Sequence, residues 1–202
     1  MELKEELIRR AAAAKRAAYT LANVSSEIKN KALIAMAEAL QAGKEDILFK
    51  NEIDVEAAKE AGLSNALIDR LSLNAARIEA MVKGLRELAG LQDPVGEVLS
   101  STERPNGLKI NKIRVPLGVV GIIYESRPNV TVDTAGLCLK SGNAVILRGG
   151  SEAVNSNHIL VKTIAAAAYG AGIPEGAIQF VETTDRQAVL ELVKLDKFID
   201  VI

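Results

Sequence analysis

The sequence has few of the residues on which metal sites and disulfides depend: one cysteine and one histidine among 202 residues, with no tryptophan. A single cysteine excludes a disulfide within the chain and is typical of a protein from a reducing compartment, so we expect a cytoplasmic location. A single histidine makes a dedicated zinc site a poor hypothesis, because such sites draw on several histidine and cysteine ligands. We therefore expect no bound metal.

Neither an excess of one charge nor a long apolar run is present. Lysine and arginine number 25 against 26 aspartates and glutamates, so we expect no nucleic-acid partner and no anionic membrane surface as partner. No uncharged run approaches the roughly 18 apolar residues of a membrane-spanning helix, and the amino terminus has a charged amphipathic pattern instead of a signal sequence. The charge balance leaves open the hypothesis of a small anionic ligand held by one or two local cations.

The hydrophobic pattern divides the chain into three parts. Residues 1–94 have helical spacing, and residues 95–116 alternate around Arg104-Pro105-Asn106-Gly107, which predicts a β-hairpin. A two-stranded ribbon is marginal alone, so we expect it to pack on a partner domain or on a second subunit. Residues 117–202 alternate short apolar runs with helical patterns, which predicts a Rossmann-like α/β fold: a parallel sheet with helices on both faces.

The individual elements follow from spacing and from capping residues. Ser25 or Ser26 and Asn74 are expected to cap helices, and Gly90 to end one. The predicted helices lie over 3–21, 28–40, 75–90, 130–140, 155–169 and 186–193, and the predicted strands of the sheet over 119–124, 144–147, 177–181 and 198–202. Because the last strand ends the chain on an apolar run without a closing turn, we expect the chain to be truncated here.

Two segments follow strands at the edge where ligands of parallel sheets bind. They are Glu125-Ser126-Arg127-Pro128-Asn129 and Arg148-Gly149-Gly150-Ser151-Glu152. Arg148 can bind a phosphate through its planar fork, and the glycines let the backbone approach a ligand; a Gly-Gly after a strand is also common in a plain turn. The Asn129 amide can stabilise an oxyanion, although asparagine is equally at home as an ordinary turn residue.

Other conspicuous residues have simpler interpretations. The glycines of Tyr169–Gly176 follow a helix and precede a strand, the reverse of a dinucleotide-binding loop, so they indicate a helix end and a turn. Cys138 lies within a predicted helix and is expected to behave as a small core residue, not as a nucleophile. His158 is expected to be solvated or to cap a helix.

The stretch VPLGVVGIIYESRPNVTVDTAGLCLKSGNAVILRGGSEA resembles the gamma-glutamyl phosphate reductases, or glutamate-5-semialdehyde dehydrogenases, a branch of the aldehyde dehydrogenase superfamily. RPNVTVD and GNAVILRGG are its most specific parts, and IDRLSLNAARI and LDKFIDVI extend the likeness essentially from end to end. The resemblance implies that NADPH reduces L-glutamyl 5-phosphate to L-glutamate 5-semialdehyde, with release of phosphate, in proline biosynthesis. It also implies a homo-oligomer and an association with glutamate 5-kinase.

The resemblance assigns roles to residues as well. Asn129 matches the asparagine of the superfamily's oxyanion hole, and Arg148–Glu152 match its Lys-Pro-Ser-Glu segment, which contacts the adenosine ribose or its 2′-phosphate. Arginine in place of lysine suits NADP, and Glu125 and Arg127 complete the expected cofactor site. The superfamily's nucleophilic cysteine belongs to a segment that nothing here resembles, so we expect a cofactor-binding half that is inactive alone. The alternative is a non-catalytic nucleotide-binding or assembly module of the same fold.

Overall fold

The computed structural model describes residues 2–202, apart from the side chain of Glu2, and contains a three-stranded parallel sheet in the order β3-β4-β5. The strands are β3 (Val119–Ile123), β4 (Ala144–Arg148) and β5 (Ile178–Phe180). Helix α6 (Pro128–Lys140) connects the first two strands and α7 (Val154–Gly170) connects the second and third, as parallel neighbours require. The predicted parallel α/β sheet is confirmed.

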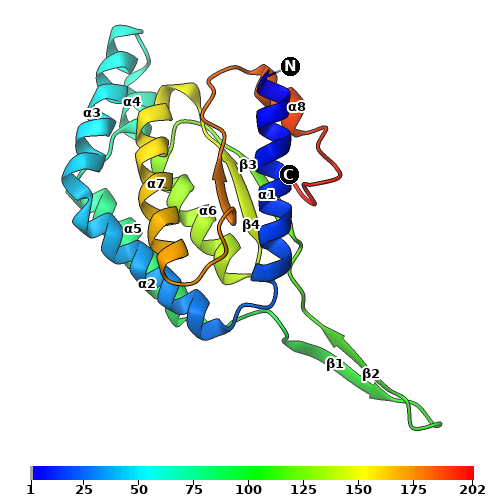
Figure 1. Cartoon of the computed structure of the whole chain (residues 1–202). Coiled ribbons are helices and arrows are strands. Elements are labelled where there is room, and N and C mark those ends of the chain that lie inside the picture. The colour runs from blue at the N-terminus through cyan, green and yellow to red at the C-terminus, as the bar shows by residue number, and fades with distance from the viewer. Residues whose placement is uncertain (1) are drawn as a thin grey trace.

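Helices cover both faces of this sheet (Figure 1). On β4, Val145 and Leu147 point into a core shared with α6 and α7, whereas Ala144 and Ile146 point into a second core. Successive side chains of a strand face opposite sides, so a strand covered on both sides has to be apolar throughout. That requirement is why the apolar run of β4 is a reliable predictor of a central strand.

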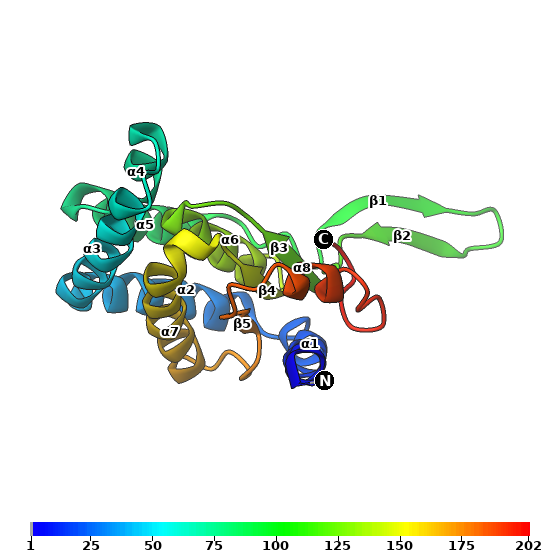
Figure 2. The same ribbon diagram turned by 90° about the horizontal axis from the view of Figure 1, so that it is seen from above.

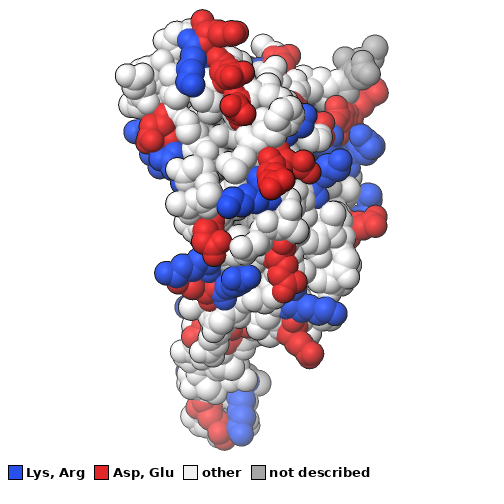
Figure 3. Space-filling view, turned by 90° about the vertical axis from the view of Figure 1, so that its left-hand side faces the viewer, with Lys and Arg blue, Asp and Glu red and all other residues white. Residues whose placement is uncertain are grey.

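Five helices precede the sheet. They are α1 (Glu2–Leu21), α2 (Ser26–Ala42), α3 (Lys44–Glu60), α4 (Asn65–Leu71) and α5 (Ala75–Gly90). Ser25 caps α2 and Asn74 caps α5, each by accepting a backbone N–H, as predicted. Helices α3 and α4 are additional to the predicted ones, and α2 and α3 carry both charge signs on their outer surface (Figure 3).

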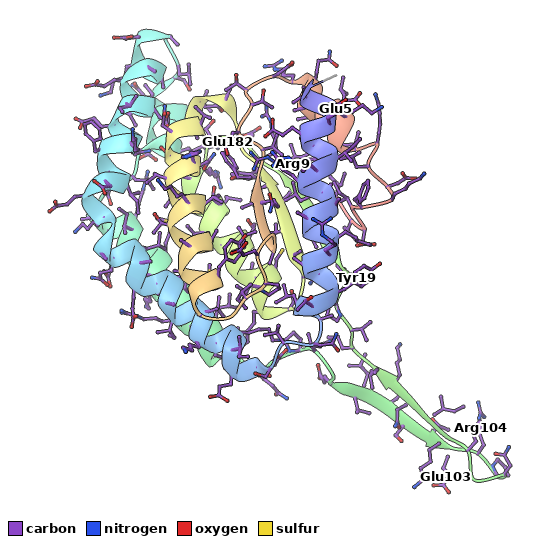
Figure 4. The ribbon with its side chains drawn as sticks, viewed as in Figure 1. Glu5, Arg9, Tyr19, Glu103, Arg104 and Glu182 are labelled. Atoms are coloured by element: carbon purple, nitrogen blue, oxygen red, sulfur yellow. The ribbon has the colours of Figure 1, made fainter. Side chains whose placement is uncertain are left out.

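Helix α1 lies against the sheet on the face opposite α6 and α7. Its buried stripe of Leu7, Ala11, Ala14 and Ala18 packs on β4 and on α8 (Gln187–Leu192). Among residues 2–202, no helix is both long and apolar enough to cross a membrane. Figure 4 shows Glu182, just after β5, beside this helix, where it pairs with Arg10 at 3.2 Å between Nη2 and Oε1.

The predicted hairpin is confirmed. β1 (Val98–Glu103) and β2 (Lys109–Ile113) pair antiparallel and project away from the helices and the sheet as a two-stranded ribbon (Figure 2). Glu103 and Arg104 mark its tip (Figure 4). Every residue of both strands is exposed, so the ribbon contributes nothing to either core.

The predicted strand at 198–202 is only partly formed: one parallel bridge joins Val201 to Val120, and the Val201 carbonyl accepts the N–H of Gly121 at 2.8 Å. The prediction is wrong for residues 198 and 199, which close a turn because their N–H groups donate to the Leu195 carbonyl at 2.9 Å. Between the turn and the bridge, Asp200 Oδ2 accepts the N–H of Val119 at 2.8 Å while Oδ1 binds Lys15 Nζ at 2.7 Å.

Candidate functional site

The loops that follow β3 and β4 lie side by side at one edge of the sheet. The N–H of Tyr124 donates to the Arg148 carbonyl at 3.1 Å, and the Ser126 hydroxyl donates to the Glu152 carboxylate. The structure therefore brings together the two segments in which the sequence concentrates candidate site residues. Parallel strand ends are where ligands of such sheets bind.

Glu152 provides the acidic group of this edge. Burial by itself raises the pKa of this carboxyl group. Hydrogen bonds from Ser126 and Ser151 and the nearby charge of Arg148 lower the pKa by more than burial raises it, so the net pKa lies below its ordinary value. A side chain at Gly150 would collide with the carboxylate, since a Cβ there would lie 2.6 Å from Oε1. Glu152 is thus an ionised acceptor at neutral pH, held between two hydroxyl donors.

Arg148 is turned into the protein, and only 8% of the residue is exposed. Its Nη1 donates to the Gly149 carbonyl at 2.8 Å and its Nη2 to the Thr184 carbonyl, after β5, at 3.3 Å. Its Nε is buried without a partner among the described residues. The guanidinium therefore lies between the ends of β4 and β5, with one donor unsatisfied and one held by a long bond.

The surroundings of Gly149 fit a nicotinamide dinucleotide. Asn157 Nδ2 is the second buried donor without a partner in the described chain, and it lies 2.2 Å from the position that a Cβ on Gly149 would take. Buried unpaired donors are unusual in folded proteins and ask for a ligand or water. Together with the Glu152 carboxylate, which suits ribose hydroxyls, and with Arg148, which suits a phosphate, they form an appropriate donor and acceptor set.

The start of α7 is already occupied by a carboxylate. Asp54, 3% exposed on α3, accepts the N–H groups of Asn155 and Ser156 at 3.3 and 2.7 Å and their side-chain donors at 2.8 and 2.6 Å. A dinucleotide loop of the glycine-rich kind places its pyrophosphate at a helix start. Asp54 takes that place here, in agreement with the absence of such a motif from the sequence.

Asn51, one helical turn before Asp54, joins the same helix start to the loop between α4 and α5. Its Nδ2 donates to the Leu71 carbonyl at 2.9 Å and to Ser156 Oγ at 3.0 Å, and its Oδ1 accepts the N–H of Leu73 at 2.6 Å. Sequence reasoning missed this connection. Its signal is a buried helical stripe in which two of the four residues are polar: Ile47, Asn51, Asp54 and Ala58.

A cavity of about 360 Å³ lies between the α4–α5 loop and the start of α6, and Asn129 is in its wall. Asn129 Nδ2 donates to Asp133 Oδ2, one helical turn later, at 3.1 Å. Burial raises the pKa of Asp133, although the bond from Asn129 opposes the rise. Because an amide nitrogen carries two hydrogens, the second stays available for a ligand in the cavity.

The predicted site residues separate into two groups. Arg127 and Asn129 line the cavity, whereas the residues from Arg148 to Glu152 form the neighbouring strand edge. Glu125 is exposed in the loop between them, and its carbonyl accepts the Arg127 N–H at 2.8 Å. Sequence reasoning missed four further charged residues of the cavity wall: Asp69, Arg70, Arg77 and Asp133.

Cys138 and His158 lie outside both groups. Cys138 is buried, and burial raises the pKa of its thiol to about 11, so almost none of it is the nucleophilic thiolate at neutral pH. His158 is exposed on α7, with Nδ1 3.6 Å from a carboxylate oxygen of Glu182. Neither residue has the surroundings of a catalytic group.

The chain matches the model of the aldehyde dehydrogenase family over residues 2–202. It is 56% identical over 202 residues to a gamma-glutamyl phosphate reductase of Halothermothrix orenii, covering 100% of this chain and 48% of that protein. It is 61% identical over 189 residues to the Moorella thermoacetica protein of the same name, covering 94% and 45%.

The fold agrees with these similarities. The crystal structure of gamma-glutamyl phosphate reductase from Thermotoga maritima superposes with a TM-score of 0.95 at 48% identity, covering 97% of this chain and 48% of that one. The chain therefore spans about half the length of the curated relatives it matches.

Proposed function

The chain belongs to the aldehyde dehydrogenase family, and on that premise we propose that it forms the NADP-binding half of a cytoplasmic gamma-glutamyl phosphate reductase. One observation carries the proposal: two sites are neighbours at the carboxyl ends of β3 and β4. One is the cavity that contains Asn129, and the other is the donor and acceptor set of Arg148 and Glu152. The proposed reaction reduces L-glutamyl 5-phosphate to L-glutamate 5-semialdehyde and phosphate, a step of proline biosynthesis.

Each group has a defined task in this proposal. Glu152 would accept hydrogen bonds from ribose hydroxyls and Arg148 would bind the 2′-phosphate. The backbone of Gly149, Gly150 and Ser151, with Glu125 and Arg127 in the neighbouring loop, would complete the set of residues that hold the cofactor. The bound nicotinamide supplies the hydride. Asn129 Nδ2 donates to the substrate's carbonyl oxygen as negative charge develops on it.

The proposed reaction needs a nucleophile that displaces phosphate, and we assign it to a thiolate outside residues 1–202. Cys138 is unsuitable because its thiol is buried in the core between α6 and its neighbours. We expect Cys138→Ser to leave the kcat of the complete enzyme unchanged, since the thiol only packs. Loss of activity in a variant with an unchanged circular dichroism spectrum would overturn this assignment.

Arg148→Ala tests the cofactor assignment. The long bond from Nη2 to the Thr184 carbonyl is the one that a 2′-phosphate would replace with a charge-assisted bond. We expect KM for NADPH to rise roughly tenfold or more, because a hydrogen bond to a charged group contributes about 1.5–3 kcal/mol, and KM for NADH to change little. Arg16→Ala, exposed on α1, is the matched control. Equal effects on the two cofactors would contradict the 2′-phosphate role.

The function itself is tested by phosphate-dependent reduction of NADP by L-glutamate 5-semialdehyde, the reverse of the proposed reaction, with the enzyme that contains this chain. Formation of NADPH that requires both substrates supports the proposal. NADPH binding without any turnover would favour the alternative, a non-catalytic nucleotide-binding or assembly module.

We also propose that the protein is a homo-oligomer, with the β1–β2 ribbon as part of the contact. A two-stranded ribbon with every residue exposed has no stabilising partner within the described chain.

Association with glutamate 5-kinase is a further proposal. Acyl phosphates hydrolyse in water, so an enzyme that makes the acyl phosphate close to this one would limit its loss.

A further inference from the structure

The cavity that contains Asn129 has an unusual concentration of arginine. Arg70 comes from the end of α4, Arg77 from the first turn of α5, and Arg127 from the residue before α6. Two carboxylates, Asp69 and Asp133, share the wall. A volume of about 360 Å³ is in the range of small-molecule sites.

Both carboxylates are already paired within the cavity wall. Asp69 Oδ1 accepts Arg77 Nη2 at 3.0 Å, and Arg77 Nη1 also donates to the carbonyls of Asp69 and Ser72. Arg77 is thereby fixed to the α4–α5 loop and shapes the wall. Asp133 accepts the Asn129 amide at 3.1 Å, so neither carboxylate neutralises the remaining arginines by direct contact.

Arg70 and Arg127 are left without partners: within residues 2–202, neither guanidinium makes a hydrogen bond or an ion pair, and both residues are exposed. Arg127 is also the N-cap residue of α6, and its side chain makes no capping bond. The positive end of the helix therefore adds to the charge of the two guanidinium groups.

We propose that Arg70 and Arg127 bind an anionic group of the substrate, a carboxylate or an acyl phosphate, and direct its carbonyl toward Asn129. This inference rests on the proposed function, since L-glutamyl 5-phosphate carries both groups. The planar fork of arginine matches the two oxygens of either anion. Arg70 lies on α4, away from the strand ends of Arg148 and Glu152, so its loss is expected to affect substrate and to leave cofactor binding intact. Arg127 also lies beside the proposed cofactor loop, so the Arg70 variant is the one that separates the two sites.

The first test needs no turnover. The full chain is titrated separately with L-glutamate and with inorganic phosphate while the arginine Nε–H resonances are followed by NMR. We expect saturable shifts of Arg70 and Arg127 with at least one probe, and an affinity roughly tenfold weaker in Arg70→Gln and Arg127→Gln. Arg86→Gln, exposed on the same helix as Arg77, serves as control. Absence of saturable shifts, or equal weakening in the control, would overturn the inference.

The second test identifies the anion. In the NADP-reducing direction, an increase of KM for phosphate in Arg70→Gln or Arg127→Gln assigns the site to the phosphoryl group, and an increase of KM for the semialdehyde assigns it to the carboxylate. Unchanged KM values for both would overturn the inference. A wild-type enzyme that fails to turn over defeats the proposed function instead, and the titration then decides on the anion site alone.

Discussion

Asn129→Ala is expected to lower the kcat of the complete enzyme by roughly 10²–10³, the usual effect of removing one oxyanion donor. The amide lies in the cavity wall, with one hydrogen held by Asp133 and the other free. Its bond to the substrate oxygen strengthens as charge develops, so the loss falls on kcat and leaves KM for NADPH unchanged. Steady-state kinetics of the phosphate-dependent reaction measure both quantities.

Two further variants sharpen this prediction. Asn129→Asp keeps the shape but replaces the donor by a carboxylate, so its activity should fall at least as far. Gln92→Ala, exposed after α5, removes an amide outside the cavity and should retain full activity. A kcat for Asn129→Ala equal to that of Gln92→Ala would remove Asn129 from the catalytic site.

Asp54→Ala is expected to lower the free energy of unfolding by about 3–4 kcal/mol. The buried carboxylate accepts bonds from the backbone and the side chains of Asn155 and Ser156. Alanine would leave these donors unsatisfied in a dry interior and would remove the cap of α7. Urea unfolding followed by circular dichroism gives the change through the shift of the midpoint at constant slope.

The same helix supplies the control for this experiment. Asp46 lies in the first turn of α3 and is exposed, so Asp46→Ala should change stability by less than about 1 kcal/mol. Asp54→Asn retains one acceptor oxygen and should lie between the two. An Asp54→Ala variant as stable as Asp46→Ala would show that this carboxylate does not hold α7 in place.

The sheet is predictable from sequence because of where its strands lie. β4 is covered on both faces and has to be apolar throughout, so composition alone identifies it. α3 escapes the same reasoning because Asn51 and Asp54 interrupt its buried stripe. The segment 198–202 shows the opposite error: its apolar residues indicate a strand throughout, but residues 198 and 199 close a turn on the Leu195 carbonyl and only Val201 forms a bridge to β3.

The residues of the candidate site also differ in how far the sequence predicts them. Arg148 ends strand β4 and Glu152 follows it, while Arg127 and Asn129 follow the neighbouring strand, so the rule for parallel sheets finds them. Arg70 and Arg77 reach the cavity only through the packing of α4 and α5, and no local pattern marks them. Asn51, through its bonds to Leu71 and Leu73, ties that loop to the start of α7.

The cofactor site at Arg148–Glu152 is tested most directly by an equilibrium titration of the folded chain with NADPH and, separately, with NADH, followed by the fluorescence of the nicotinamide. We expect saturable binding of NADPH, roughly tenfold or more tighter than that of NADH, because the 2′-phosphate gains a charge-assisted bond to Arg148. A folded chain that binds neither nucleotide would contradict the claim that these residues form a cofactor site.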